Sequence, residues 1–74
     1  MRDVPIRGDM IRLGQLLKLA GVAGSGSEAK ELLAGGGVTV NGEPEDRRGR
    51  QLREGDVVVV GEERMRIAAT TLDS

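Results

Sequence analysis

Three arginines are crowded into four positions of this chain: Arg47, Arg48 and Arg50. The segment from 47 to 53 holds four arginines and no acidic residue. A guanidinium group is a planar fork of N–H donors that can grip a phosphate at two points, so the cluster favours a phosphate-bearing ligand. A second interpretation stays open, because three acidic residues just before the cluster could pair with it on a solvated loop. They are Glu43, Glu45 and Asp46.

A second pattern suited to phosphate is the segment SGSE at residues 25–28. It fits a capping box, in which the Ser25 side chain accepts from the Glu28 amide and the Glu28 carboxylate accepts from the Ser25 amide. A helix start carries unpaired amides and about half a positive charge, which suits phosphate, and Lys30 would add a charge nearby. The plainer interpretation is that Ser25 and Ser27 are caps first and that Lys30 pairs with a neighbouring glutamate.

Arg12 and Lys18 belong to the first predicted helix. The apolar residues of this segment recur at i, i+3, i+4 and i+7, which is one face of a helix. They are Leu13, Leu16, Leu17 and Ala20. Asp9 is placed to cap the start of this helix, and Gly21 to end it. Arg12 and Lys18 fall mostly off the apolar face, so they are either ligand-binding cations or the solvated side of an amphipathic helix.

These cationic positions must be held by an α+β framework. The second helix carries Ala29, Leu32 and Leu33 and stops at the glycines 35–37, so two short helices form an αα-hairpin. The period then changes to 2, with an Asn41-Gly42 turn of type I′. The predicted extended segments are Val4–Ile6, held at a sheet edge by its proline, Val38–Val40, a piece beginning at 51–52, Val57–Val60 at the sheet centre, and Arg64–Ile67 with Met65 and Ile67 inward.

Several kinds of chemistry are disfavoured by composition. The chain has no His and no Cys, so imidazole catalysis, thiol nucleophiles and the usual zinc ligands are missing, and neither a metal nor a cofactor is expected. The three glycines at 35–37 end a helix instead of opening one, which is the wrong context for a phosphate-binding loop of an enzyme. No catalytic constellation is present, so we expect no enzyme. There is also no aromatic residue on which an unpaired base could stack.

Size and charge set further expectations. A chain of 74 residues suggests one domain, 1–74, with a frayed tail at 68–74. No apolar run is long enough for a membrane span and no secretory signal is present, so we expect a cytoplasmic monomer. The formal net charge of −1 argues against strong nucleic-acid binding, but the arginine cluster shows that charge is distributed unevenly.

Three segments taken together resemble the S-four RNA-binding domain, named after a ribosomal small-subunit protein. They are IRLGQLLKLAGV, SGSEAKELLAGGGVTVNGE and EDRRGRQLREGDVVVV, which span about residues 11–60. SEAK, the glycine before VTVNGE, RRG and GDVVVV are weak signals separately and strong in this order and spacing. The resemblance is closest to small bacterial proteins that consist of this domain alone.

The resemblance implies the alpha-L fold, a helix pair packed on a small, mostly antiparallel sheet of four to five short strands. It implies a non-catalytic module that binds structured RNA, ribosomal or tRNA-like, through phosphate contacts from the helix pair and the arginine-rich loop. The RNA-binding residues that it implies are Arg12, Lys18, Ser25, Ser27, Lys30, Arg47, Arg48 and Arg50. Many relatives carry an arginine between the two serines, where this chain has Gly26, so one phosphate contact is missing.

The sequence leaves two other functions open. A protein-interaction adaptor could use the same surface, with a protein or the ribosome as partner. VTVNGE and GDVVVV also resemble segments of the small ubiquitin-like sulfur carriers, but those end in Gly-Gly, whereas this chain ends in TTLDS and has both helices before VTVNGE.

Overall fold

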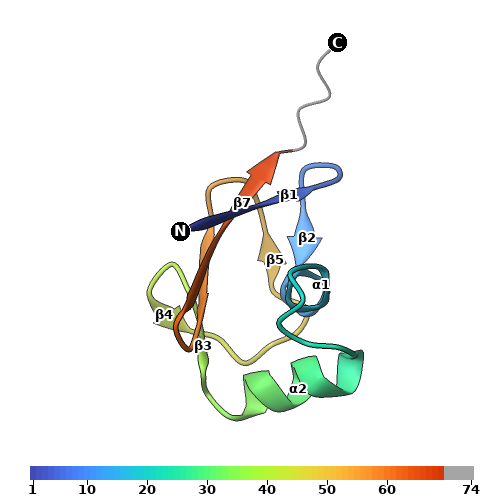
Figure 1. The fold of residues 1–74 in the computed structure, drawn as a ribbon, viewed down its shortest axis with the longest axis vertical. Helices are drawn as coiled ribbons and strands as arrows, with labels where there is room; N and C mark the ends of the chain where they lie inside the picture. Colours follow the sequence, from blue (N-terminus) through green and yellow to red (C-terminus); the bar gives the residue numbers. More distant parts are fainter. Residues whose placement is uncertain (70–74) are drawn as a thin grey trace.

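The computed structural model describes residues 1–69 (Figure 1). Its elements follow one another as β1 (Arg2–Ile6), β2 (Ile11–Arg12), α1 (Leu13–Leu19), α2 (Gly26–Ala34), β3 (Val38–Val40), β4 (Glu43–Pro44), β5 (Gln51–Leu52), β6 (Val57–Val60) and β7 (Glu63–Ala69). Five strands form a sheet in the order β1-β7-β6-β3-β4, and β2 pairs with β5 in a second, two-stranded sheet. Only β1 and β7 run parallel; the other pairs are antiparallel. The predicted α+β class, with a helix pair and a mostly antiparallel sheet, is therefore confirmed.

The core lies between the two helices and one face of the large sheet. Val40, Val58 and Met65 stand opposite one another on β3, β6 and β7 and are fully buried. From the helices, Leu13, Leu16, Leu17, Ala29 and Leu33 join the same buried cluster. Cross-strand partners share a face, so the outer face carries the alternate residues Thr39, Val59 and Arg64. The predicted inward positions of β7 and the central place of β6 are confirmed.

The start of α1 differs from the prediction. The helix begins at Leu13, with Arg12 as its cap residue, and Asp9 lies upstream of a short strand. Ile11 and Arg12 pair with Leu52 and Gln51 of β5, which keeps their backbone extended until the helix starts. The expected Asp9 cap was therefore wrong, because a pairing between distant segments overrides the local capping signal. Gly21 does follow the helix in a left-handed conformation, with a φ of 77°, as predicted.

The expected fraying from residue 68 onward is also corrected. Ala68 and Ala69 belong to β7, where they pair with Pro5 and Ile6 of β1. The parallel pairing with β1 at the sheet edge gives these residues backbone partners. The rest of the predicted tail, 70–74, lies outside the described residues.

The Asn41-Gly42 turn forms as predicted and also holds another turn in place. Both residues have positive φ, 53° and 85°, as a type I′ hairpin turn requires. The Asn41 side chain donates to Asp56 Oδ1 over 3.1 Å and accepts from the Val57 amide over 2.9 Å. The hairpin between β3 and β4 is thereby tied to the start of β6.

No helix in the part of the chain that the structure describes is long and apolar enough to cross a membrane.

Candidate nucleic-acid interface

A groove of about 550 Å³ runs between α1 and the loop that precedes β5. Its lining residues are Arg12, Gly14, Gln15, Lys18, Gly26, Arg47, Arg48 and Gly49. We call this the basic groove, because four of these residues are cationic and none is acidic. A surface of this kind attracts anions even though the whole chain has a net charge of −1. The groove therefore collects cations that lie far apart in the sequence.

The segment Arg47–Arg50, which we call the arginine loop, is attached to the first turn of α1. The Leu13 amide donates to the Arg50 carbonyl over 2.8 Å, and the Gly14 amide donates to the Arg48 carbonyl over 3.0 Å. The first amides of a helix have no partner within the helix, so the loop satisfies two of them. The ladder between β2 and β5 continues this attachment on the side before Leu13 and after Arg50. The position of the arginine loop is thus set by backbone bonds to α1.

Gly14 lies against Arg48 of the arginine loop. A Cβ atom at position 14 would lie 3.4 Å from the Cβ atom of Arg48 and 3.6 Å from its carbonyl oxygen. A Cβ atom at these distances makes ordinary van der Waals contact, so alanine fits here without moving the arginine loop. An isolated glycine inside a predicted helix costs about 1 kcal/mol relative to alanine, and this is the one sequence signal that marks the position.

Arg12 and Lys18 reach the groove from the same side of α1. They lie at i and i+6, with Gln15 between them at i+3, and all three line the groove. Gln15 also orders the helix start, because its Oε1 accepts from the Arg12 amide over 3.1 Å. The solvated side of this amphipathic helix therefore forms one wall of the basic groove.

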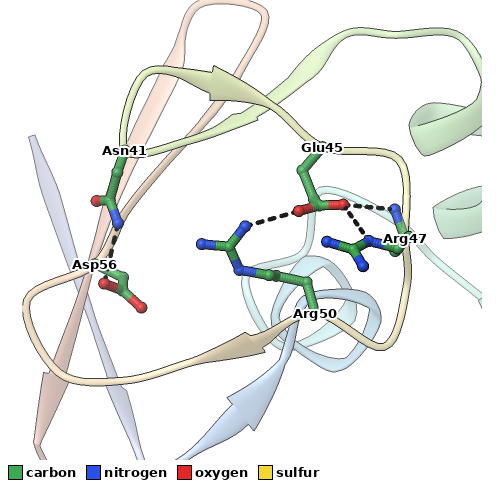
Figure 2. A network of polar contacts seen from close by, with 5 residues as sticks. All are labelled: Asn41, Glu45, Arg47, Arg50 and Asp56. Atoms are coloured by element: carbon green, nitrogen blue, oxygen red, sulfur yellow. Dashed lines mark hydrogen bonds and ion pairs between the residues drawn. The ribbon is translucent and has the colours of Figure 1, made fainter.

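Glu45 is a buried acid next to the arginine loop, and Figure 2 shows it between two arginine side chains. Its Oε2 accepts from Arg47 Nε over 3.0 Å and from the Arg47 amide over 3.2 Å, while its Oε1 accepts from Arg50 Nη1 over 2.7 Å. These hydrogen bonds, from Arg47 first and then from Arg50, lower the pKa of Glu45 to about 2. The same pair raises the pKa of Arg47. The carboxylate is therefore ionised at any physiological pH.

This network partly fulfils the alternative in which the arginines pair with nearby acids. Glu45 pairs with Arg47 and Arg50, whereas Glu43 and Asp46 form no ion pair with the loop among residues 1–69. The Arg48 side chain likewise has no ion pair within that part of the chain. The arginines of the loop thus differ in their surroundings, which the sequence did not indicate.

The structure brings together some of the sequence-predicted residues and separates others. Arg12, Lys18, Arg47 and Arg48 share the basic groove. Arg50 lies outside it and lines an adjoining hollow of about 590 Å³ with Arg47, Gly49 and Gln51. The other three predicted residues, Ser25, Ser27 and Lys30, are exposed on or beside α2 but do not line the groove. Whether they contact a ligand stays a prediction.

The start of α2 borders the groove through Gly26. Ser25 caps this helix, since its Oγ accepts from the Glu28 amide over 3.2 Å. Of the predicted capping box only this half is present in the described residues; the Glu28 carboxylate lies beside Gly24 instead.

The groove lining that sequence analysis missed consists of Gly14, Gln15 and Gly49. The described residues also contain no cluster of His, Cys, Asp and Glu that could hold a metal ion.

Comparisons with known proteins agree with this fold. A family model described as the S4 domain matches residues 4–68. The Probable ribosome maturation protein RlbA of Bacillus subtilis (strain 168) is 53% identical over 57 residues, which cover 77% of this chain and 80% of that protein. The solved 30S ribosomal protein S4e from Thermoplasma acidophilum matches with a TM-score of 0.61 and 24% identity, over 80% of this chain. The match covers 31% of that ribosomal protein, and at this identity it concerns the fold alone.

Proposed function

The chain belongs to the S4 domain family, and from this premise we propose that it is a non-catalytic RNA-binding module that holds structured RNA by its phosphates. The observation that carries the proposal is the basic groove, which gathers four cationic side chains and no acid. The RNA backbone offers closely spaced phosphates, and arginine binds them with two parallel hydrogen bonds. A groove of this charge is suited to a continuous phosphate chain.

The residues differ in the part we assign to them. Arg12 at the cap of α1 and Lys18 within that helix contact phosphates directly, together with Arg47 and Arg48 on the arginine loop. Ser25, Ser27 and Lys30 form a second row along α2, where the helix start at Gly26 adds its own partial positive charge. These assignments rest on the groove and on the family resemblance of the motif that contains the residues.

The RNA is recognised by shape and backbone more than by base sequence. The chain has no aromatic side chain, so it has no stacking platform for unpaired bases. Folded RNA presents phosphates and 2′-hydroxyls in fixed positions, which a preformed groove can match. The relative RlbA is named as a probable ribosome maturation protein, so we propose ribosomal RNA as the ligand and the ribosome or its precursor as the partner particle. We further propose that residues 1–74 act as one domain, as a monomer, in the cytoplasm.

Salt dependence tests this function. Binding of a ribosomal RNA fragment that contains helices and loops should weaken with a slope of about −3 in log affinity against log salt, if four phosphates are neutralised. Arg48→Ala should reduce the size of that slope by about 0.7 to 0.9, because one phosphate contact is lost. Fluorescence anisotropy over a series of salt concentrations measures both values.

The matched control is Arg64→Ala, which removes the same charge from the exposed outer face of β7. It should leave the slope unchanged. Equal effects of the two substitutions, or a slope near zero for the wild-type chain, would contradict the proposed groove. Tight binding of tRNA in place of the ribosomal fragment would retain the module and reassign its ligand.

A protein adaptor is the second candidate, and one feature favours it. A hollow of about 610 Å³ beside α1 is lined mainly by apolar residues, including Met10, Ile11 and Leu19, and Leu19 is 56% exposed. A protein partner retained on the immobilised chain after nuclease treatment, and lost on Leu19→Glu, would favour the adaptor. A protein partner that nuclease treatment releases would instead be held to the chain through RNA, which favours the RNA-binding function.

A further inference from the structure

We propose that Glu45 is a positioning residue for RNA recognition, which holds Arg47 in a binding-competent orientation through a chain of contacts that begins at Arg50. The inference rests on the proposed function, because it concerns how the basic groove meets its ligand. Glu45 itself lines neither the groove nor the adjoining hollow, and so it acts through the arginines.

The contacts link the partly buried Arg50 to the exposed Arg47 through the buried Glu45. The side chain of Arg50 is 33% exposed and donates from Nη1 to Glu45 Oε1, which fixes the carboxylate on one side. Glu45, whose side chain is 6% exposed, then accepts on Oε2 from both the amide and the Nε of Arg47. The side chain of Arg47 is 75% exposed. Figure 2 shows the three side chains in this order, with the carboxylate in the middle.

The geometry assigns different tasks to the loop arginines. The Arg47 side chain donates to Glu45 through Nε, and neither of its Nη groups has a partner within residues 1–69, so both can bind a phosphate at the groove. Arg50 is committed to Glu45 and lies outside the basic groove, so its effect on RNA is indirect. Arg48 accepts on its carbonyl from the Gly14 amide, and no hydrogen bond joins it to Glu45 within residues 1–69. Glu45 therefore governs Arg47 and leaves Arg48 unaffected.

The advantage of this arrangement is preorganisation. A free arginine side chain loses rotamer freedom when it binds a phosphate, and that loss weakens association. In this structure the Nε and the backbone of Arg47 are already restrained before any ligand arrives. Two bonds on one carboxylate oxygen restrain both the backbone amide and the guanidinium group of Arg47. The bound geometry of Arg47 is thus largely present in the free protein.

Positioning and simple charge attraction predict opposite changes in RNA affinity when Glu45 is neutralised. Glu45 is an acid next to a basic groove, so by Coulomb attraction alone its neutralisation should tighten RNA binding. If Glu45 instead orients Arg47, neutralisation should weaken binding despite the more favourable charge. The sign of one measurement separates the two.

The experiment compares Glu45→Gln with Glu43→Gln. Both remove one negative charge within three residues of chain, but Glu43 is exposed and pairs with none of the loop arginines in the described part of the chain. At fixed salt, Glu45→Gln should weaken binding of the ribosomal RNA fragment by about fivefold, the loss expected when one or two long side chains must be ordered on binding. Glu43→Gln should leave affinity unchanged or slightly higher.

A second pair of variants excludes a general effect on folding. In an Arg47→Ala background most of the fivefold effect of Glu45→Gln should vanish, whereas in an Arg48→Ala background it should persist. An effect of equal size in both backgrounds, or tighter binding by Glu45→Gln, would overturn the inference while leaving the proposed function intact. If the wild-type chain binds RNA without salt dependence, the proposed function fails first and this inference with it.

Discussion

Glu45 keeps its charge although its side chain is nearly covered by the protein. A buried carboxylate normally loses the stabilisation of water, which raises its pKa. Here hydrogen bonds from Arg47 and Arg50 outweigh that effect and lower the pKa to about 2. The residue is therefore both a structural anchor of the arginine loop and a titratable group with a distinct pH range.

The pH dependence of stability follows from this shift. The folded pKa of about 2 is below the ordinary value of 4.5, so Glu45 contributes stability that is complete above pH 4.5 and is lost as pH falls toward 2. The difference in unfolding free energy between wild type and Glu45→Gln should be largest at neutral pH and shrink in acid. Urea denaturation of both proteins at pH 7, 4.5, 3 and 2 measures it. A difference that stays constant or grows in acid would mean that the carboxylate does not hold the loop.

Gly26 offers a gain-of-function test. A Cβ atom at this position meets no other atom within 4 Å, and the residue lines the basic groove. Gly26→Arg should raise RNA affinity up to about fivefold, the strength of one exposed ion pair, and steepen the salt slope by about 0.7 to 0.9. Gly37→Arg, which adds the same charge in open space beyond the far end of α2, is the control. Equal gains from both variants would show attraction by total charge instead of a contact in the groove.

At the scale of elements, the basic groove depends on how short segments are joined. The strands β2 and β5 have two residues each, and neither could form a stable pair alone. Their ladder and the amides of α1 together attach the arginine loop, while the Asn41 turn links the β3–β4 hairpin to the start of β6. The segment between β4 and β6 is thus held at two places: its arginine loop is bound to α1, and its end at β6 is bound to the Asn41 turn.

The Asn41 turn can be tested by two substitutions that differ in one respect. Asn41→Gly keeps access to positive φ but loses the side-chain bonds to Asp56 and Val57, at a cost of about 1 kcal/mol. Asn41→Ala loses the same bonds and also places a Cβ atom at a φ of 53°, so its total cost is about 2 kcal/mol or more. Urea denaturation gives both values. Similar losses for Gly and Ala would refute the contribution of the backbone conformation.

At the scale of the whole molecule, the structure separates an apolar inner layer from two differently charged regions. The helices cover one face of the large sheet, while the arginine loop carries the excess of positive charge beside α1. Between residues 54 and 69, four acidic residues outnumber two basic ones, and none of these charged residues lines the groove. The total of −1 is therefore a poor guide to the surface that a phosphate meets.

The one-sided core gives a paired prediction on neighbouring valines. Val58 is fully buried against the helices, whereas Val59 points to the outer face and is half-buried. Val58→Ala should lower the unfolding free energy by about 2 kcal/mol, and Val59→Ala by less than about 1 kcal/mol. The loss at Val58 is a large share of the total stability, since a chain of this length has an unfolding free energy of about 4 to 11 kcal/mol. Equal losses in chemical denaturation would mean that both faces of the sheet are covered.

Much of the fold could be predicted because its signals are local. The apolar stripe of α1, the Ser25 cap, the Asn41-Gly42 turn and the run of valines in β6 each depend on residues a few positions apart. Steric limits on the backbone and the burial of one face act on those residues directly. The family match over residues 4–68 confirms the resemblance that these segments suggested when taken in order.

Only the tertiary structure decided which residues meet. Arg12 and Arg47 share a groove because β2 pairs with β5, and because of the same pairing the cap residue of α1 is Arg12 and not the predicted Asp9. The choice of Glu45 over Glu43 and Asp46 as partner of the arginines depends on which carboxylate the fold buries. Such contacts form only after distant segments are brought together, and their energy depends on the water that the surrounding chain excludes. Local sequence carries no direct signal of either.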